Sequence, residues 1–342
     1  MRIAIASGKG GTGKTTVATN LAYVAAQAGC EVDYVDCDVE EPNGHLFLKP
    51  AFQEERVVSK LVPRVDAQRC AACGECARFC QFHALACVRS KVLVYPELCH
   101  ACGGCRWVCP QDAIDEERQE IGRVRNGHAG RIRFVEGRLR VGEAQSPPVI
   151  RAAKEAAPKA ELVLFDAPPG TACPVVETVR GSDFVVLVTE PTPFGIHDLR
   201  LALDMARCMN LRCGLVINRA MVGRTGARTL GQKARIPLLA EIPDDLAIAE
   251  AYSDGKLAVE AVPGLRRTFA QLLLRLASAA ASAGGLPDKV RANLEQIVDR
   301  PAISTPLVSR RPSSGPPPVC FLSLRMRKAK ADRVPINPTA DQ

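Results

Sequence analysis

Long apolar runs are absent from this chain of 342 residues. None reaches the roughly 18 consecutive residues that indicate a membrane-spanning helix. The apolar start MRIAIAS gives way at Gly8 to a glycine-rich segment and is too short for the apolar core of a secretory signal peptide. The sequence therefore predicts a cytoplasmic protein without stable membrane insertion.

A basic face is also lacking, although the formal net charge is +8. Residues 301–342 hold seven Lys and Arg against two Asp and Glu, a net charge of +5 that leaves +3 for the first 300 residues. Proteins that bind nucleic acid gather positive charge on one face of a folded domain. Because the excess here lies in a terminal segment, the distribution argues against a nucleic-acid partner.

Histidine is scarce, with five in the chain and none after His197. This scarcity disfavours a catalytic Cys–His pair of the amidotransferase type in the C-terminal half. Cysteine, in contrast, is abundant, with fifteen residues. In a chain without a signal peptide, so many cysteines indicate metal or redox chemistry rather than disulfide bonds.

Apolar, β-branched runs alternate with amphipathic stretches along most of the chain. Continuous apolar strands between helices are typical of a doubly wound, mostly parallel α/β sheet. The expected strands cover residues 2–7, 31–36, 161–166, 183–190, 212–218 and 237–242. The expected helices cover residues 14–28, 147–157 and 196–209. Residues 131–143 have the pattern of a small hairpin that turns at Glu136 and Gly137.

The segment GKGGTGKT at residues 8–15 fits the phosphate-loop pattern, between a predicted strand and a predicted helix. In such a loop, backbone N–H groups converge on phosphate oxygens at an electropositive helix N-terminus. We expect Lys14 to reach the β- and γ-phosphates, Thr15 to bind Mg²⁺ and Thr16 to add a phosphate contact. The predicted nucleotide-binding residues of the loop are Gly8, Lys9, Gly10, Gly11, Thr12, Gly13, Lys14, Thr15 and Thr16.

Two aspartates lie at or just beyond the ends of predicted strands. Asp166 ends the apolar strand of LVLFDAPPGT, where a residue that helps to hold Mg²⁺ is expected. Asp38, in YVDCDVEEPN, lies just beyond the strand end at Asp36, where it can orient an attacking water. A lone aspartate at a strand end is commonly a turn former, but two of them in a chain with a phosphate loop favour a site for nucleotide hydrolysis.

Four segments, KGGTGKTT, DCDVEEPN, DAPPGT and VINR, together resemble the deviant-Walker ATPases of the MinD/ParA/Mrp class. The resemblance implies that ATP and Mg²⁺ are cofactors and that the segments of Asp38 and Asp166 are nucleotide-sensing switches. It also implies that Asn218 contacts adenine, and that the early lysine, Lys9, supports an ATP-dependent homodimer by reaching the partner's phosphates. The predicted catalytic residues are Lys9, Lys14, Asp38 and Asp166.

The segments CAACGECARFC and CHACGGCRWVC share the spacing C-x₂-C-x₂-C-x₃-C, so the second run, from Cys99, repeats the first, from Cys70. Zinc also accepts four thiolates, but zinc ribbons use two C-x₂-C pairs separated by a long loop. The run resembles bacterial ferredoxins, in which the fourth cysteine of each run binds the other cluster. This resemblance implies two [4Fe–4S] clusters. One is bound by Cys70, Cys73, Cys76 and Cys109, and the other by Cys99, Cys102, Cys105 and Cys80.

The predicted organisation is an ATPase domain in two parts, residues 1–62 and 118–283. A small α+β ferredoxin domain at residues 63–117 interrupts it. The remaining segment, 284–342, holds nine prolines and is predicted to be a basic, disordered tail. Gln81 departs from the ferredoxin pattern, which has a proline after the fourth cysteine, as Pro110 is in the second run.

Three functions remain open at the level of sequence. The favoured one is an ATPase whose nucleotide state controls electron transfer through its two clusters to an unidentified redox partner. The second is an iron–sulfur carrier of the Mrp type that serves an acceptor protein, although Cys208 and Cys213 lack the C-x-x-C spacing of that branch. The third is a MinD/ParA-like positioning ATPase. Cys173 lies seven residues after Asp166, where the related nitrogenase iron protein has a cluster ligand, but it has no second cysteine nearby in sequence and is interpreted as structural.

Overall fold

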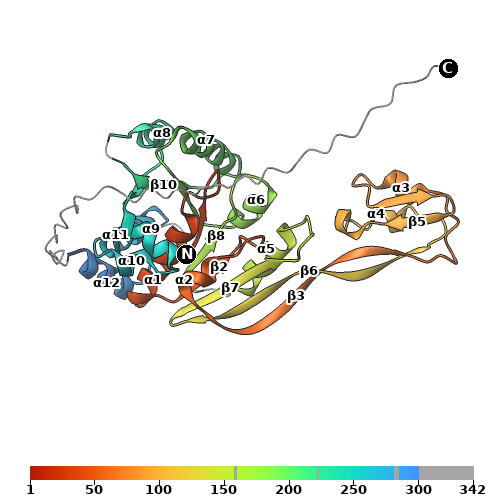
Figure 1. Ribbon diagram of the computed structural model, residues 1–342, viewed down its shortest axis with the longest axis horizontal. Helices are drawn as coiled ribbons and strands as arrows, with labels where there is room; N and C mark the ends of the chain where they lie inside the picture. The colour runs from red at the N-terminus through yellow and green to blue at the C-terminus, as the bar shows by residue number, and fades with distance from the viewer. Residues whose placement is uncertain (158–159, 222, 281–284, 300–342) are drawn as a thin grey trace, which may run out of the picture. The chain divides into compact units, whose positions relative to one another are not determined.

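The computed structural model describes residues 1–157, 160–221, 223–280 and 285–299. Its main feature is a nine-stranded sheet in the order β11-β10-β9-β1-β8-β2-β7-β6-β3 (Figure 1). The strands from β11 to β7 are parallel to one another, and β6 pairs antiparallel with both of its neighbours, β7 and β3. The predicted mostly parallel α/β sheet is therefore confirmed. The strands are β1 (Arg2–Ala6), β2 (Val32–Asp36), β3 (Ala51–Val65), β6 (Ile114–Ala129), β7 (Ile132–Leu139), β8 (Leu162–Asp166), β9 (Phe184–Thr189), β10 (Cys213–Ala220) and β11 (Leu238–Pro243).

Helices cover both faces of this sheet, because alternate residues of each buried strand point to opposite sides. In β1, Ile3 and Ile5 belong to one apolar core, and Ala4 and Ala6 belong to the other. The first core is formed with α1 (Lys14–Gln27), α2 (Gly44–Leu48), α9 (Leu246–Ser253), α10 (Ala258–Ala261), α11 (Leu265–Ala279) and α12 (Asp288–Asp299). The second is formed with α5 (Pro147–Ala156), α6 (Cys173–Val179), α7 (Pro193–Cys208) and α8 (Gly226–Ala234).

The predicted hairpin at residues 131–143 is wrong. Residues 132–139 form the single strand β7, which pairs in parallel with β2 and antiparallel with β6. Glu136 lies inside this strand and is fully buried. Its carboxylate is compensated there by two side chains, because Arg125 and His45 contact its two oxygens at 2.6 and 2.9 Å. Gly137 leaves room for Val39, whose Cγ1 atom would lie 2.6 Å from a Cβ atom at this position. The Glu–Gly pair therefore serves close packing rather than a turn.

The predicted disordered tail is also wrong at its start. Residues 288–299 form α12, in which Val290 and Leu294 are buried against the first core. The side-chain amide of Asn293 donates a hydrogen bond to the carbonyl oxygen of Ala28 at 2.8 Å. The prediction was wrong because it used the proline content of the whole segment, whereas the amphipathic pattern covers only its first part. The rest of the predicted tail, residues 300–342, lies outside the described residues.

Strands β3 and β6 extend as a two-stranded ribbon from the sheet to a small lobe that contains the cysteine runs (Figure 1). The two strands are paired from Ala51 opposite His128 to Val65 opposite Ile114. We call residues 66–113, between these strands, the cysteine lobe. It contains α3 (Glu75–Phe79), β4 (Leu85–Val88), β5 (Lys91–Val94), the 3₁₀ turn η1 (Pro96–Leu98) and α4 (Gly104–Trp107). The predicted domain boundaries at 63 and 117 fall within the ribbon.

Candidate functional site

A cavity of about 480 Å³ lies where the loops after β1, β2, β8 and β11 meet the end of β10, at the carboxyl edge of the parallel sheet. This edge is where α/β sheets bind their ligands. The predicted site residues that line it are Gly10, Gly11, Gly13, Lys14, Thr15, Thr16, Asp38 and Asn218. Gly8, Lys9 and Thr12 belong to the same loop but do not line the cavity, and neither does Asp166 at the end of β8.

The phosphate loop leaves the first turn of α1 free to bind an anion. The helix begins at Lys14, and Gly13, at its N-cap, has no side chain to cap the first N–H groups. Gly13 has φ of 92°, and a Cβ atom there would clash with the side-chain amide of Asn218. Only glycine satisfies both constraints. Free N–H groups at the electropositive end of a helix fit a phosphate group.

Charged side chains converge next to this loop. Burial lowers the pKa of Lys14, although the charges of Asp166 and Asp38 oppose that effect. Burial, together with the charge of Asp166, raises the pKa of Asp38 to about 6. Burial also raises the pKa of Asp166, an effect that the hydroxyl groups of Thr15 and Tyr34 and the charge of Lys14 oppose.

The buried Oδ1 atom of Asp166 has no hydrogen-bond partner among the described residues, and Thr15 is close to this carboxylate. A hydroxyl and a carboxylate oxygen suit Mg²⁺, which prefers oxygen ligands. The residues present therefore fit a nucleotide with its metal ion, and their individual roles remain predictions.

Two buried residues that the sequence analysis did not single out hold the switch aspartates in place. The hydroxyl of Tyr34 donates to Asp166 Oδ2 at 2.8 Å. The carboxylate of Asp36 accepts hydrogen bonds from the backbone N–H groups of Asp38, Asn43 and Gly44, at 3.1, 3.1 and 2.9 Å. Asp36 thus fixes the loop that carries Asp38. The signal for this role was present in sequence, because Asp36 is the last residue of an apolar strand.

Lys9 points away from the cavity. Its ammonium group lies 3.3 Å from Oε2 of Glu190, a residue that is 7% exposed, and Arg219 contacts Oε1 of the same carboxylate at 2.8 Å. Asn218, predicted to contact adenine, lines the cavity and donates from its side-chain amide to the Thr12 carbonyl oxygen at 2.8 Å. Gly8 has no room for a Cβ atom because the backbone of Asp198, in α7, lies against it.

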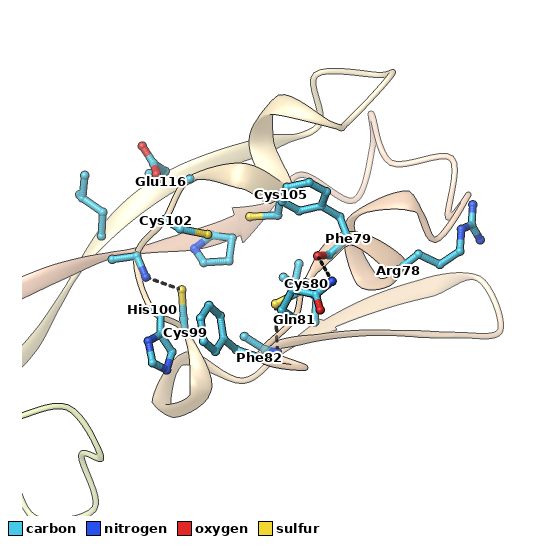
Figure 2. A pocket seen from close by; sticks show the side chains of 16 residues that line it. Arg78, Phe79, Cys80, Gln81, Phe82, Cys99, His100, Cys102, Cys105 and Glu116 are labelled. Carbon is cyan, nitrogen blue, oxygen red and sulfur yellow. Dashed lines mark hydrogen bonds between the residues drawn. The ribbon is translucent and has the colours of Figure 1, made fainter. Parts of the chain in front are cut away.

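The eight cysteines of the two runs line two separate cavities in the cysteine lobe. Each cavity takes the first three cysteines of one run and the fourth of the other. One set is Cys80, Cys99, Cys102 and Cys105, whose sulfur atoms surround the cavity in Figure 2. The other set is Cys70, Cys73, Cys76 and Cys109. These are the two sets that the ferredoxin resemblance implies as ligands, and their ligand role remains a prediction.

The two runs also share a backbone conformation. Non-glycine residues with positive φ occur at equivalent positions in the two runs, at Ala72 and Ala101, with φ of 52° and 54°, and just after them, at His83 and Asp112, with φ of 53° and 45°. Gly74 and Gly103 repeat the same conformation, with φ of 77° and 70°. Consecutive N–H groups around such residues point inward and bind anionic groups. The repeat in sequence is therefore a repeat in structure.

Backbone N–H groups are directed at several of the cysteine sulfur atoms. Ala84 and Ala113, again at equivalent positions of the repeat, donate to the sulfur atoms of Cys80 and Cys109 at 3.4 and 3.3 Å. Such hydrogen bonds favour the thiolate form that metals require. Burial acts in the opposite direction and raises the pKa of Cys105 to about 11. A cation in the cavity would offset that effect of burial.

The two cavities differ in size and cover. The cavity of the Cys99 set has a volume of about 360 Å³, whereas that of the Cys70 set has about 20 Å³, room for about one water molecule. Phe82 and His100 stack beside the larger cavity with their ring centroids 3.6 Å apart (Figure 2). Among the described residues, no three or more His, Cys, Asp or Glu side chains converge on one point as they do around a single metal ion.

Residues 3–259 match the family of CobQ/CobB/MinD/ParA nucleotide-binding domains. The chain belongs to this family. Its nucleotide-binding ATPase domain accounts for the sheet, the phosphate loop and the cavity at the carboxyl edge. The match runs across the ribbon and the cysteine lobe without assigning a role to either.

Several other proteins are similar to this CobQ/CobB/MinD/ParA family member. The uncharacterized protein MJ0578 of Methanocaldococcus jannaschii is 33% identical over 222 residues, which cover 64% of this chain and 78% of the relative. An iron-sulfur cluster carrier protein of Synechocystis is 52% identical over 46 residues, 14% of this chain and 13% of the relative. The structure also resembles the septum site-determining protein MinD of Pyrococcus horikoshii with Mg-ADP. That match has a TM-score of 0.51 and 21% identity, and it covers 83% of this chain and 97% of the other, so it shows a shared fold.

The remaining cysteines with a possible role lie apart from both sets. Cys173 is exposed at the first residue of α6. Cys208 is exposed at the end of α7, and Cys213 is buried at the start of β10. No helix in the described part of this family member is long and apolar enough to cross a membrane.

Proposed function

We propose that this chain is an ATP-hydrolysing iron–sulfur protein in which nucleotide-driven dimerisation controls electron transfer through two [4Fe–4S] clusters to a partner protein. One observation carries the proposal. Eight cysteines, attached through the ribbon to a nucleotide-binding ATPase domain, divide into two sets of four, each around its own cavity. The exchange of the fourth cysteine between the runs is the arrangement of bacterial ferredoxins.

The nucleotide half of the mechanism follows from the loop and its neighbours. The free N–H groups of the first turn of α1 bind the phosphates, and Lys14 neutralises charge that develops on the γ-phosphate. Thr15 and Asp166 hold Mg²⁺. Asp38, held by the loop that Asp36 fixes, orients the attacking water. In the proposed dimer Lys9 leaves Glu190 and reaches the phosphates of the partner subunit.

The redox half depends on the cysteine lobe. The two [4Fe–4S] clusters would supply one-electron redox chemistry between a low-potential donor protein and the partner, and the eight cysteines of the two runs would hold them. The lobe supplies four thiolates for each cluster, backbone N–H groups that lower the charge on the sulfur atoms, and apolar cover from Phe79 and Phe82 on the side of Cys80.

The test is the metal content of anaerobically purified full-length protein. We expect close to eight iron atoms and eight acid-labile sulfides per chain, the sum of two four-iron clusters. Cys76→Ala should lose one cluster and Cys105→Ala the other, with ATP binding retained in both. Cys87→Ala is the matched control, because Cys87 lies in the lobe but lines neither cavity. Stoichiometric zinc without acid-labile sulfide would contradict the proposal.

A second candidate is an iron–sulfur cluster carrier or assembly ATPase. The short match to the Synechocystis iron-sulfur cluster carrier protein favours it. The two functions differ in what leaves the protein. A carrier loses iron and sulfide to an apo-acceptor when ATP is added, whereas the electron-transfer protein keeps its eight iron atoms and is oxidised. Iron retention measured after incubation with an apo-ferredoxin separates them.

A further inference from the structure

The short segment of residues 139–146 contacts both the nucleotide-site loop and the cysteine lobe. At its start, the backbone N–H of Leu139 donates to the carbonyl oxygen of Val39 at 2.7 Å. Val39 directly follows Asp38, so this bond attaches the end of β7 to the first predicted switch. Asp38 and Leu139 are therefore connected through one peptide bond and one backbone hydrogen bond.

At its other end, the segment contacts the loop of Cys99. The side-chain amide of Gln145 donates to the carbonyl oxygen of Cys99 at 3.0 Å. Glu143 accepts from the backbone N–H of Gln145 at 3.1 Å and forms an ion pair with Lys60, in β3, at 2.8 Å. The side chains of Lys60 and Glu143 are 4% and 0% exposed. A buried ion pair tolerates little displacement, because separating it leaves a charge without a partner.

The second predicted switch reaches the same segment through two helices. Helix α6 begins at Cys173, seven residues after Asp166. The ammonium group of Lys154, in α5, donates to the carbonyl oxygens of Glu177, Thr178 and Arg180 at the end of α6, at 2.7, 2.6 and 2.7 Å. Helix α5 begins at Pro147, directly after the segment. Both switches are thus connected by hydrogen bonds and short stretches of chain to residues 139–146.

The contact with the lobe involves one cysteine set and not the other. Gln145 bonds to the backbone of Cys99. Lys60 directly precedes Leu61, which lines the cavity of the Cys99 set. In the part of the chain that the structure describes, no side-chain hydrogen bond or ion pair joins residues 139–146 to a cysteine of the Cys70 set. Residues 139–146 therefore connect the nucleotide site to the predicted cluster of the Cys99 set and not to that of the Cys70 set.

We infer that residues 139–146 couple nucleotide state to the cluster held by Cys80, Cys99, Cys102 and Cys105, with Gln145 and the Lys60–Glu143 pair as positioning residues. The inference rests on the proposed function and adds that only this cluster responds to the nucleotide. A hydrogen bond to the ligand's own backbone and a buried cation nearby are two ways in which a protein tunes a cluster. A displacement of residues 139–146 would change the hydrogen bond from Gln145 and the position of Lys60 at the same time.

The test is a redox titration of the loaded full-length protein, monitored by electron paramagnetic resonance, with ADP or with a non-hydrolysable ATP analogue. The Cys76→Ala and Cys105→Ala variants assign the two signals. In the wild type we expect the midpoint potential of the Cys99-set cluster to differ between the two nucleotides and that of the other cluster to stay constant. Gln145→Ala should reduce the difference several-fold while iron content and nucleotide affinity stay at wild-type values. Gln68→Ala, an exposed glutamine of the lobe, should leave the difference unchanged.

Amide hydrogen exchange in the wild type gives a readout that needs no variant. Exchange at residues 99–105 should differ between ADP and the ATP analogue, and exchange at residues 70–76 should not. An equal nucleotide response in wild type and Gln145→Ala, or no response at residues 99–105, would overturn the inference while leaving the eight iron atoms in place. A protein without iron and sulfide would instead overturn the proposed function.

Discussion

At the scale of single residues, the phosphate cradle and the water-orienting group are separate. The cradle is made of backbone N–H groups and Lys14, whereas Asp38 reaches the cavity from the loop that Asp36 fixes. Asp38→Ala should therefore keep ATP affinity and lower hydrolysis about 100-fold or more, the usual contribution of a positioned acid–base group. Lys14→Ala should weaken ATP binding about 10- to 100-fold, since it removes a charged hydrogen bond. Calorimetric titration and phosphate release measure the two effects.

Lys9 is the second residue whose role can be isolated. In the Asp38→Ala background, which binds ATP without turnover, we expect ATP to drive dimerisation and ADP not to. Adding Lys9→Ala should abolish the dimer and keep ATP binding, because Lys9 faces Glu190 rather than the cavity. Sedimentation velocity checks this, with Lys233→Ala, an exposed lysine of α8, as the control. A Lys9→Ala protein that dimerised as tightly as its parent would show that the lysine is only a surface charge.

At the scale of elements, α12 is expected to stabilise the ATPase domain. Leu294 is fully buried in the first core, and the neighbouring Glu295 is exposed. Leu294→Ala should lower the free energy of unfolding by about 2–5 kcal/mol, the usual cost of removing a large buried side chain. Glu295→Ala should change it by less than about 0.5 kcal/mol. Urea unfolding of the two variants decides whether α12 belongs to the core.

Elements with an unbroken apolar pattern were predictable from sequence. The strands that end at Asp36 and Asp166 were expected within one or two residues of their observed bounds. A parallel strand that is buried on both faces is a continuous apolar run, so its two ends are visible in the sequence. Glu136 and Gly137 were misread because a buried glutamate and a glycine inside a strand depend on distant partners, Arg125 and Val39. Sequence spacing does not contain that information.

The same limit applies to the candidate site. The phosphate loop was predictable, because a local motif specifies its backbone. Tyr34 and Glu190 were not, because each acts through a contact with another element. The division of the eight cysteines into two sets was predictable from the resemblance to bacterial ferredoxins, whereas the unequal sizes of the two cavities were not.

At the scale of the whole molecule, the cysteine lobe is an insertion carried by two paired strands. Val65 lies opposite Ile114 in the antiparallel register, so a two-residue Asn-Gly turn can close the ribbon in place of residues 66–113. The excised protein should bind ATP with wild-type affinity and contain no iron, because no residue of the lobe lines the nucleotide cavity. Calorimetric titration and iron analysis of the excised protein check this. Loss of ATP binding in a folded excision variant would show that the lobe is part of the ATPase domain.

The position of the chain's single tryptophan has a practical consequence. Trp107 is 92% exposed, and it lies in α4 of the lobe, between Cys105 and Cys109. The ATPase domain has no indole of its own. Intrinsic fluorescence excited at the indole band therefore reports on the lobe alone. Iron–sulfur chromophores absorb broadly where indole emits, so loading of the lobe should quench the emission. Cluster insertion, loss and oxidation can then be followed in unlabelled protein in real time.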